Sequence, residues 1–483
     1  MLPLNTKPTK TTITKAELGP SGGRTLRRAV AAVVALVSLA GSATASSEDL
    51  PAFPGATGFG KMATGWRGGR IVHVTNLADR GPGSFRTCAE DRTGPRVCVF
   101  DTSGTISLDS SVRIAPNTYI AGQTAPGDGI QIKLGKSQNT PLVIKNADSV
   151  LIRFLKSRPG ASSGPSVSVD GVTVEDSQSV YLDHMSIQFA TDENFNVHAN
   201  KRPTRDITVA RSIIAWGLDH ANHPKGKHSK GALICSTEGK TGECGRVSLV
   251  GNLFAHNRDR NPDVKGTDTG PIEIVNNVFY DAKSQFGEFY NLIGDTKIYY
   301  VGNLALAGPS TRSSPPPAAI EAFFWKPQFR LEVIADDNLN VRRPGCGQWK
   351  NLDVVDARAK PFVHAEPVQL TFDNVVPAAD VFEHVLATAG ARKAGGEQTD
   401  ALDQSLIDQV RECGGKVVDD VSETMGWPEF PVAEAPADRD RDGMPDDWEA
   451  AHGLDLDDPA DTWADRDGDG WSNIEEYLNE LAS

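Results

Sequence analysis

Short segments of a shared design recur through the middle of the chain. Each begins with alternating apolar and polar positions, which is the period of a β-strand, and successive segments start 25 to 40 residues apart. In the later segments an asparagine follows five residues after the first apolar position. The segments span residues 150–158, 180–189, 207–216, 247–256, 272–281, 298–307 and 333–341, and the asparagines are Asn252, Asn277, Asn303 and Asn338.

A repeat of this length predicts a solenoid. The repeat is too short for a βαβ unit and too rich in strands for helical repeats, and a single coil cannot bury its apolar face unless coils stack. Asparagine at a fixed position fits a tight bend, because it tolerates left-handed backbone geometry and its amide can hydrogen-bond along a stack. A β-sandwich is the alternative, but its strands would more often lie about 8 to 12 residues apart. We therefore predict an all-β fold of the parallel β-helix type.

The pattern is less regular after residue 342. A helix is expected over residues 400–410, and the proline-rich stretch 428–436 indicates a linker. The 46 glycines, 30 prolines and few aromatic residues favour turns and short strands throughout. We expect a β-helix domain with a C-terminal extension over residues 48–430 and a small separate module over residues 436–483.

The net charge of −14 is concentrated in this C-terminal module. Residues 436–483 contain 16 acidic residues against three arginines, so the remaining chain is close to neutral. Dense acidic segments bind cations or stay hydrated. Nothing in the charge distribution indicates a nucleic-acid partner.

Two stretches of the module match the 12-residue calcium loop of EF-hand proteins. Calcium takes six to eight hard oxygen ligands, a central glycine permits the sharp turn, and the last glutamate can bind through both oxygens. We predict an EF-hand-like or dockerin-like module that folds around Ca²⁺; a solvated acidic tail is the alternative. The predicted ligands are Asp438, Asp440, Asp442, Asp446 and Glu449 in the first loop and Asp465, Asp467, Asp469, Asn473 and Glu476 in the second.

The N-terminus has the pattern of a secretory signal peptide. Three arginines between residues 24 and 28 precede the apolar run 29–40, and Ala43-Thr44-Ala45 offers a small-residue cleavage site. An apolar run of about 12 residues is too short to cross a bilayer, and a buried helix is the alternative. We predict a signal peptide over residues 1–45, a secreted protein and no membrane span.

Six cysteines in an exported chain indicate disulfide bonds. The close pairs Cys88/Cys98 and Cys235/Cys244 favour local bridges and leave Cys346 to pair with Cys413, but the sequence alone leaves the connectivity open.

Several motifs occur together in an order that is typical of one enzyme family. They are FPGATGFG (53–60), GGRIVHVTNLADRGPGSFR (68–86), IAGQTAPGDGI (120–130), YLDHMSIQFATDENFNV (181–197), RSIIAWGL (211–218), HSKG (228–231) and RNPDVKG (260–266). With these, the chain resembles the pectate lyases of polysaccharide lyase family 1, especially the secreted microbial ones, over about residues 52–310. The resemblance implies a right-handed parallel β-helix. It also implies Ca²⁺-assisted β-elimination of (1→4)-α-D-galacturonan, which leaves 4,5-unsaturated oligogalacturonides.

The resemblance also implies roles for three basic residues. The family's R-x-P-x-x-R motif resembles residues 260–265, so Arg260 takes the place of the catalytic base. Lys265 replaces the second arginine, which holds a substrate carboxylate, and it keeps the charge but loses the bidentate fork. Lys230 matches the family's substrate-binding lysine.

Three further residues match the family's calcium ligands. Asp170 matches an aspartate upstream of the W-x-D-H motif, and Asp192 and Asn196 match a pair of aspartates four residues apart. The chain departs from the family at Asn196, which offers only a neutral oxygen, and at Tyr181, where tryptophan is usual.

The coil positions are consistent with these roles. Asp192 lies 12 residues into its segment and Arg260 lies 13 into its own, so both are expected on one side of the solenoid. Stacked coils are about 4.8 Å apart, so two coils leave about 10 Å, enough for a sugar ring. We expect an acidic polysaccharide as the partner of a monomeric enzyme, with a docking partner for the C-terminal module left open.

Two other functions compete with the lyase. A hydrolase on the same fold would need paired carboxylates around the bond, for which Asp183, Asp192, Glu193 and Asp263 are available. A non-catalytic, calcium-dependent glycan-binding protein would suit the changes at Asn196 and Lys265. For Asp183 and His184 a structural role, stacking and hydrogen-bonding along the solenoid, is favoured. His220, His223 and His228 form a cluster that could suggest a transition metal, but a solvent-facing loop is the better explanation.

Overall fold

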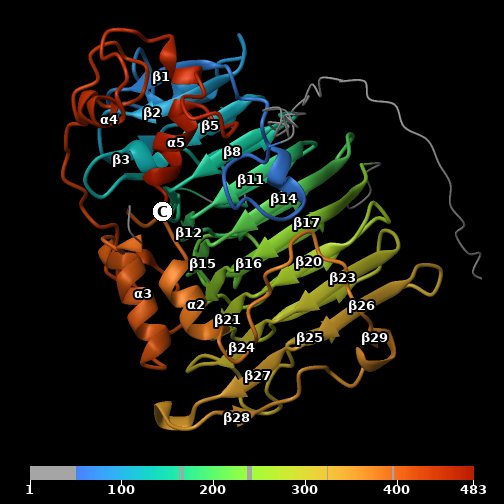
Figure 1. The fold of residues 1–483 in the computed structure, drawn as a ribbon. Coiled ribbons are helices and arrows are strands. Elements are labelled where there is room, and N and C mark those ends of the chain that lie inside the picture. The colour runs from blue at the N-terminus through green and yellow to red at the C-terminus, as the bar shows by residue number, and fades with distance from the viewer. Residues whose placement is uncertain (1–49, 163, 165–167, 237–241, 324, 394–395) are drawn as a thin grey trace, which may run out of the picture. The chain divides into compact units, whose positions relative to one another are not determined.

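The described chain is a parallel β-helix, and the helices that follow it in sequence pack on its side and beside its first coils (Figure 1). The computed structural model describes residues 50–162, 164, 168–236, 242–323, 325–393 and 396–483. Three sheets form the walls of the helix, and all strand pairs among the described residues are parallel except β27 with β28.

The first sheet contains, in spatial order, β1 (Arg70–Val74), β2 (Arg96–Phe100), β5 (Thr118–Ala121), β8 (Val150–Arg153), β11 (Gln178–Asp183), β14 (Thr204–Ala210), β17 (Cys244–Val250), β20 (Ile272–Val275), β23 (Thr296–Val301), β26 (Leu331–Asp336) and β29 (Val363–His364). The second contains β3 (Gly104–Leu108), β6 (Ile130–Leu134), β9 (Leu155–Ser157), β12 (Ser186–Gln188), β15 (Ile213–Ala215), β18 (Leu253–Ala255), β21 (Val278–Tyr280), β24 (Leu304–Ala307), β27 (Leu339–Arg342) and β28 (Lys350–Asn351). The third contains β4 (Val112–Ile114), β7 (Leu142–Lys145), β10 (Val172–Glu175), β13 (Glu193–His198), β16 (Lys230–Ser236), β19 (Asp263–Lys265), β22 (Gly287–Tyr290) and β25 (Ile320–Ala322).

The predicted repeat is confirmed, and each recurring segment contains two strands. The segment 180–189 supplies β11 to the first sheet and β12 to the second, and the segment 272–281 supplies β20 and β21 in the same way. The strands of the third sheet lie between these segments. Apolar side chains from all three sheets point into the coils and form one continuous buried core.

The predicted asparagine stack is confirmed at the bend between the first and second sheets. The Asn277 side-chain oxygen accepts from the Asn252 backbone N–H at 3.0 Å, and the Asn303 oxygen accepts from the Asn277 N–H at 2.9 Å. The expectation of left-handed geometry at these asparagines is wrong. Positive φ falls one residue earlier, as at Asn276 (54°) and Gly302 (64°), so the preceding residue makes the bend and the asparagine holds neighbouring coils together.

Replacing Asn277 with alanine is expected to lower the free energy of unfolding by about 2 kcal/mol, because buried donors and acceptors lose their partners. The Asn277 side chain is fully buried and bonds both neighbouring rungs of the ladder. Denaturation midpoints measure the effect. Asn338→Ala, at the half-buried end of the ladder, should cost less; equal losses would contradict a ladder that stabilises the stack.

The C-terminal extension packs on the second sheet. Its helices are α2 (Val381–Thr388) and the predicted α3 (Ala401–Arg411), which begins at the N-cap Asp400. Their apolar faces share a buried cluster with residues of β15, β18, β21 and β24. Fully buried Arg158 pairs with Asp400 at 2.8 Å and with Asp403 at 2.9 Å, which fixes α3 to the coils.

The remaining helices are α1 (Phe85–Ala89), α4 (Asp446–His452) and α5 (Asn473–Glu480), with 3-10 turns η1 (Phe59–Met62), η2 (Gly122–Thr124), η3 (Pro344–Cys346), η4 (Lys360–Phe362), η6 (Val421–Glu423) and η7 (Asp461–Trp463). Three disulfides join Cys88 to Cys98, Cys235 to Cys244 and Cys346 to Cys413, as the sequence favoured.

The predicted signal peptide, residues 1–45, lies outside the described residues. Among the residues that the structure describes, no helix is long and apolar enough to cross a membrane.

Candidate active site

A groove of about 330 Å³ lies over the third sheet, along β10, β13, β16 and β19. Asp192 immediately precedes β13, and Arg260 lies just before β19, two strands further along the sheet. Both side chains line the groove together with Asn196 and Lys265. The prediction that Asp192 and Arg260 share one side of the solenoid is therefore confirmed.

An acidic cluster occupies one part of this site. Carboxylate oxygens of Asp170, Asp192 and Glu193 lie within 4.8 Å of one another, and all three residues are buried. Burial and the charge of Asp192 raise the pKa of Asp170 to about 7, and the same two causes raise the pKa of Glu193 well above its usual range. Carboxylates held this close disfavour one another's charged form unless a cation joins them.

Asn196 contributes a neutral oxygen to the cluster. Its amide nitrogen donates to Asp170 at 3.2 Å, and its buried side-chain oxygen has no hydrogen-bond partner among the described residues. An unpartnered buried oxygen beside three carboxylates provides the hard ligands that Ca²⁺ prefers. The residues present therefore fit a calcium ion, with one oxygen fewer than an aspartate at position 196 would offer, because the amide nitrogen replaces a carboxylate oxygen.

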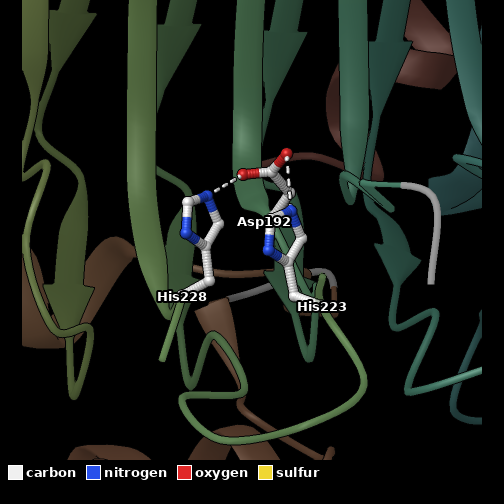
Figure 2. Close-up of side chains that lie close together, drawn as sticks. All are labelled: Asp192, His223 and His228. Carbon is white, nitrogen blue, oxygen red and sulfur yellow. Dashed lines mark ion pairs between the residues drawn. The ribbon is translucent and has the colours of Figure 1, made fainter. Parts of the chain in front are cut away.

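Two histidines, His223 and His228, contact the Asp192 carboxylate (Figure 2). His228 Nε2 lies 2.6 Å and His223 Nε2 lies 3.7 Å from the Asp192 carboxylate, and the two rings are stacked with centroids 3.9 Å apart. Burial acts to raise the pKa of Asp192, but the hydrogen bond and charge of His228, the hydrogen bond with Glu193 and the charge of His223 together lower that pKa. Both histidines are buried, so the expectation of a solvent-facing loop is wrong for them; His220 is exposed as expected.

Arg260 lies among acidic side chains. Its guanidinium pairs with Glu193, and its Nε lies 3.7 Å from Asp263. Burial lowers the pKa of Arg260, but the charges of Glu193 and Asp263 outweigh burial and raise it. The residue has a φ of 58°, a left-handed geometry that recurs at many bends between strands of this β-helix.

The two predicted substrate-binding lysines are both nearly buried. Lys265 Nζ lies 3.7 Å from Asp263 and 5.4 Å from the centre of the Tyr290 ring, and it faces the groove. Lys230, in register with Glu193 on the neighbouring strand, pairs with Asp259 at 2.5 Å. Lys230 is thus close to the site, but its charge is already matched by a carboxylate.

Three acidic residues of the site are not predicted from the sequence to act in a lyase. Glu193 is predicted only as a carboxylate of the alternative hydrolase, and Asp259 and Glu288 have no predicted role. Burial and the charges of Asp259 and Asp263 raise the pKa of Glu288 to about 8. The sequence does hold one indication that Glu193 belongs to the site, because it directly follows Asp192. Neighbouring residues within a strand point to opposite faces, but Asp192 lies before β13, so both side chains can face the groove.

Asp183 and His184 lie away from the groove, at the bend after β11. Asp183 is fully buried and pairs with Arg153 at 2.8 Å and with Arg211 at 2.7 Å, and the His184 ring stacks on Phe154. Their expected structural role is supported, and Asp183 cannot act in a hydrolase at this groove.

The two predicted C-terminal loops differ in their surroundings. In the first, carboxylates of Asp438, Asp440 and Asp442 lie within 4.8 Å of one another, and Glu449 lies equally close to Asp442. Asp446 instead accepts from the Arg439 backbone N–H at 2.8 Å.

The second loop brings together the exposed carboxylates of Asp465, Asp467 and Asp469. Glu476 pairs with Arg466 at 2.8 Å, and the Asn473 amide nitrogen donates to the backbone oxygen of Asp461. Glu476 does not belong to the carboxylate group of this loop, whereas the buried side-chain oxygen of Asn473 has no hydrogen-bond partner among the described residues.

Comparison with known proteins agrees with the site. A probable pectate lyase C of Emericella nidulans is 32% identical over 454 residues, which cover 93% of this chain and 96% of the relative. The chain belongs to the pectate lyase family. A probable pectate lyase C of Aspergillus flavus is 30% identical over 437 residues, covering 89% of this chain and 94% of that relative. The expectation of an enzyme of the pectate lyase family is confirmed. No family model matches the chain.

Solved structures also align with the chain. The cedar pollen allergen jun a 1 covers 69% of this chain and 92% of its own at 16% identity and a TM-score of 0.49. A pectate lyase of Bacillus sp. N165, solved in complex with trigalacturonate, covers 70% and 98% at 16% identity and a TM-score of 0.45.

Proposed function

We propose that the chain is a secreted, monomeric lyase that cleaves (1→4)-α-D-galacturonan by calcium-assisted β-elimination. The observation that carries the proposal is the convergence of an acidic oxygen cluster, Lys265 and Arg260 in one groove of a member of the pectate lyase family. Residues 1–45 act as the signal peptide, residues 48–430 form the catalytic β-helix domain and residues 436–483 form the calcium module. A docking partner for that module stays an open alternative.

In this mechanism Asp170, Asp192, Glu193 and Asn196 would hold a calcium ion. When bound, Ca²⁺ neutralises the uronate carboxylate and stabilises the negative charge that develops beside it. Lys265 orients the same uronate carboxylate or that of the adjacent sugar. Lys230 acts in the same way once it leaves Asp259 and binds a substrate carboxylate.

Arg260, in its neutral form, removes the proton from C5 of the uronate, because a protonated guanidinium has no electron pair to accept that proton. The electron pair of the C5–H bond becomes the C4–C5 double bond, the C4–O bond breaks, and the leaving oxygen takes up a proton from water. Arginine is a poor base because its usual pKa is about 12 or above, and its acidic neighbours raise that pKa further. Arg260 must therefore leave Glu193 before it acts, and we expect activity to rise toward alkaline pH.

The hydrolase is the competing activity, since Asp192, Glu193 and Asp263 also line or adjoin the groove. Mass spectrometry of the oligosaccharides released from polygalacturonate separates the two. Elimination gives products with one unsaturated end, each lighter by one water than the hydrolysis product of equal length. Saturated products alone would overturn the lyase proposal.

Lys265→Ala is expected to lower kcat/KM on polygalacturonate about 10- to 100-fold, mainly through KM, because a charge-assisted bond to the substrate is lost. Initial rates over a range of polymer concentrations measure this. Lys265→Arg should keep most of the activity, and Lys297→Ala, on the first sheet and 40% exposed, should match the wild type. An unchanged kcat/KM in Lys265→Ala would show that Lys265 does not contact the substrate.

A further inference from the structure

The first C-terminal loop gains a fifth carboxylate from outside the loop motif. Asp461 lies between the two loops in sequence, at the start of η7. Its carboxylate lies within 4.8 Å of those of Asp442 and Glu449, while Asp442 also belongs to the group with Asp438 and Asp440. Five carboxylates from three consecutive segments of chain therefore converge.

Asp442 and Glu449 of this cluster are buried, and the other three carboxylates are partly buried. Glu449 is fully buried, and neither of its carboxylate oxygens has a hydrogen-bond partner among the described residues. One oxygen each of Asp440, Asp442 and Asp461 is equally without a partner there. Burial and the neighbouring charges raise the pKa of Glu449 to about 8 and that of Asp442 to about 7.

The nearby basic side chains point elsewhere. Arg439 pairs with Asp446 and Asp457, and Arg441 lies 3.7 Å from Asp101. His73 comes within 3.7 Å of Asp438, at the edge of the cluster. Buried carboxylates without a partner are costly, so this arrangement is complete only with a bound cation.

The segments that carry the cluster also contact the first coils of the β-helix. Trp463, two residues after Asp461, donates from its indole N–H to the Gly69 backbone oxygen at 3.1 Å. Met444, two residues after Asp442, is fully buried in one apolar cluster with Trp66. The Thr462 hydroxyl donates to the Asp442 backbone oxygen at 3.1 Å, which joins η7 to the first loop.

We infer that Asp461 completes one partly buried calcium site with Asp438, Asp440, Asp442 and Glu449, and that the ion fastens the C-terminal module to the first coils of the β-helix. This inference rests on the proposed calcium module. Calcium is favoured because it takes six to eight oxygen ligands, and added ligand charge tightens binding. In the second loop the three grouped carboxylates are exposed and Glu476 forms an ion pair with Arg466, so we expect this loop to bind calcium more weakly.

The test measures thermal unfolding and calorimetric calcium binding of the secreted chain, without substrate. It uses an Asp192→Asn background, which weakens the groove site. Calcium should raise Tm, and Asp461→Asn should weaken the tightest binding event at least tenfold and remove most of the rise. In chelator Asp461→Asn should unfold at the same or a higher temperature than its parent, because one repelling charge is gone. Replacing a residue that only packs would lower Tm both with calcium and in chelator, and so would not show opposite effects under the two conditions.

Asp457→Asn is the matched control, since Asp457 is exposed in the same segment and outside the cluster; it should respond to calcium as its parent does. Glu449→Gln is a second variant with the same expected reversal. Calcium binding that is lost in Asp440→Asn but unchanged in Asp461→Asn would overturn the inference and leave the calcium module standing. A parent that shows no binding event and no rise in Tm would overturn both.

Discussion

Arg260→Ala is expected to lower kcat on polygalacturonate about 10³-fold. A positioned general base contributes about 10²- to 10⁴-fold to a rate, and no other basic side chain described in the groove has the same position between the acidic cluster and Lys265. Initial rates of unsaturated product at alkaline pH measure the loss.

Two variants distinguish a base from a structural arginine. Arg260→Lys keeps a cation beside Glu193 but changes its reach and its pKa, so it should fold normally and recover little activity. Arg330→Ala removes a surface arginine whose side chain is 83% exposed and should behave as the wild type. Full activity in Arg260→Ala, with an unchanged Tm, would contradict the assignment of the base.

Asp192→Asn is expected to raise the calcium concentration needed for half-maximal activity about 10- to 100-fold. The change removes one charge from a predicted ligand, and ligand charge is a main determinant of calcium affinity. It also breaks the ion pair with His228. Activity measured over a calcium titration gives the shift, and excess calcium should restore much of the rate.

Asp148→Asn provides the control, because Asp148 is a half-exposed acid away from the groove. An Asp192→Asn variant with an unchanged calcium requirement would show that the ion, if needed, is held elsewhere. A loss of activity that no calcium concentration restores would instead give Asp192 a role other than holding the ion.

The sequence predicted the parts of the fold that repeat. The strands of the first two sheets recur at fixed offsets around the ladder asparagines, so Asn277 and Asn303 mark successive coils without any structure. The third sheet was missed because its strands follow loops of changing length and carry the polar residues of the site. β13, for example, begins with Glu193 and includes Asn196, which hides an alternating apolar pattern.

The site was predictable where a motif is continuous in sequence. Arg260 lies just before β19 and Lys265 lies within it, and the resemblance to the family implies a role for both. Side chains that join from other segments gave no such signal. His223 reaches Asp192 from a loop between β15 and β16, and Asp461 reaches Glu449 from a turn outside the loop motif. Folding brings these pairs together, and the spacing of the residues in the sequence does not indicate the contact.

We propose that calcium and Arg260 act together in one groove to break pectate by elimination. The ultraviolet absorbance of the 4,5-unsaturated product from polygalacturonate, followed at alkaline pH with calcium and then with excess chelator, tests this directly. We expect a steady rise in absorbance that stops on chelation, resumes when calcium is restored and is absent in Arg260→Ala. An undiminished rise after chelation, or no unsaturated product from a folded, calcium-loaded protein, would contradict it.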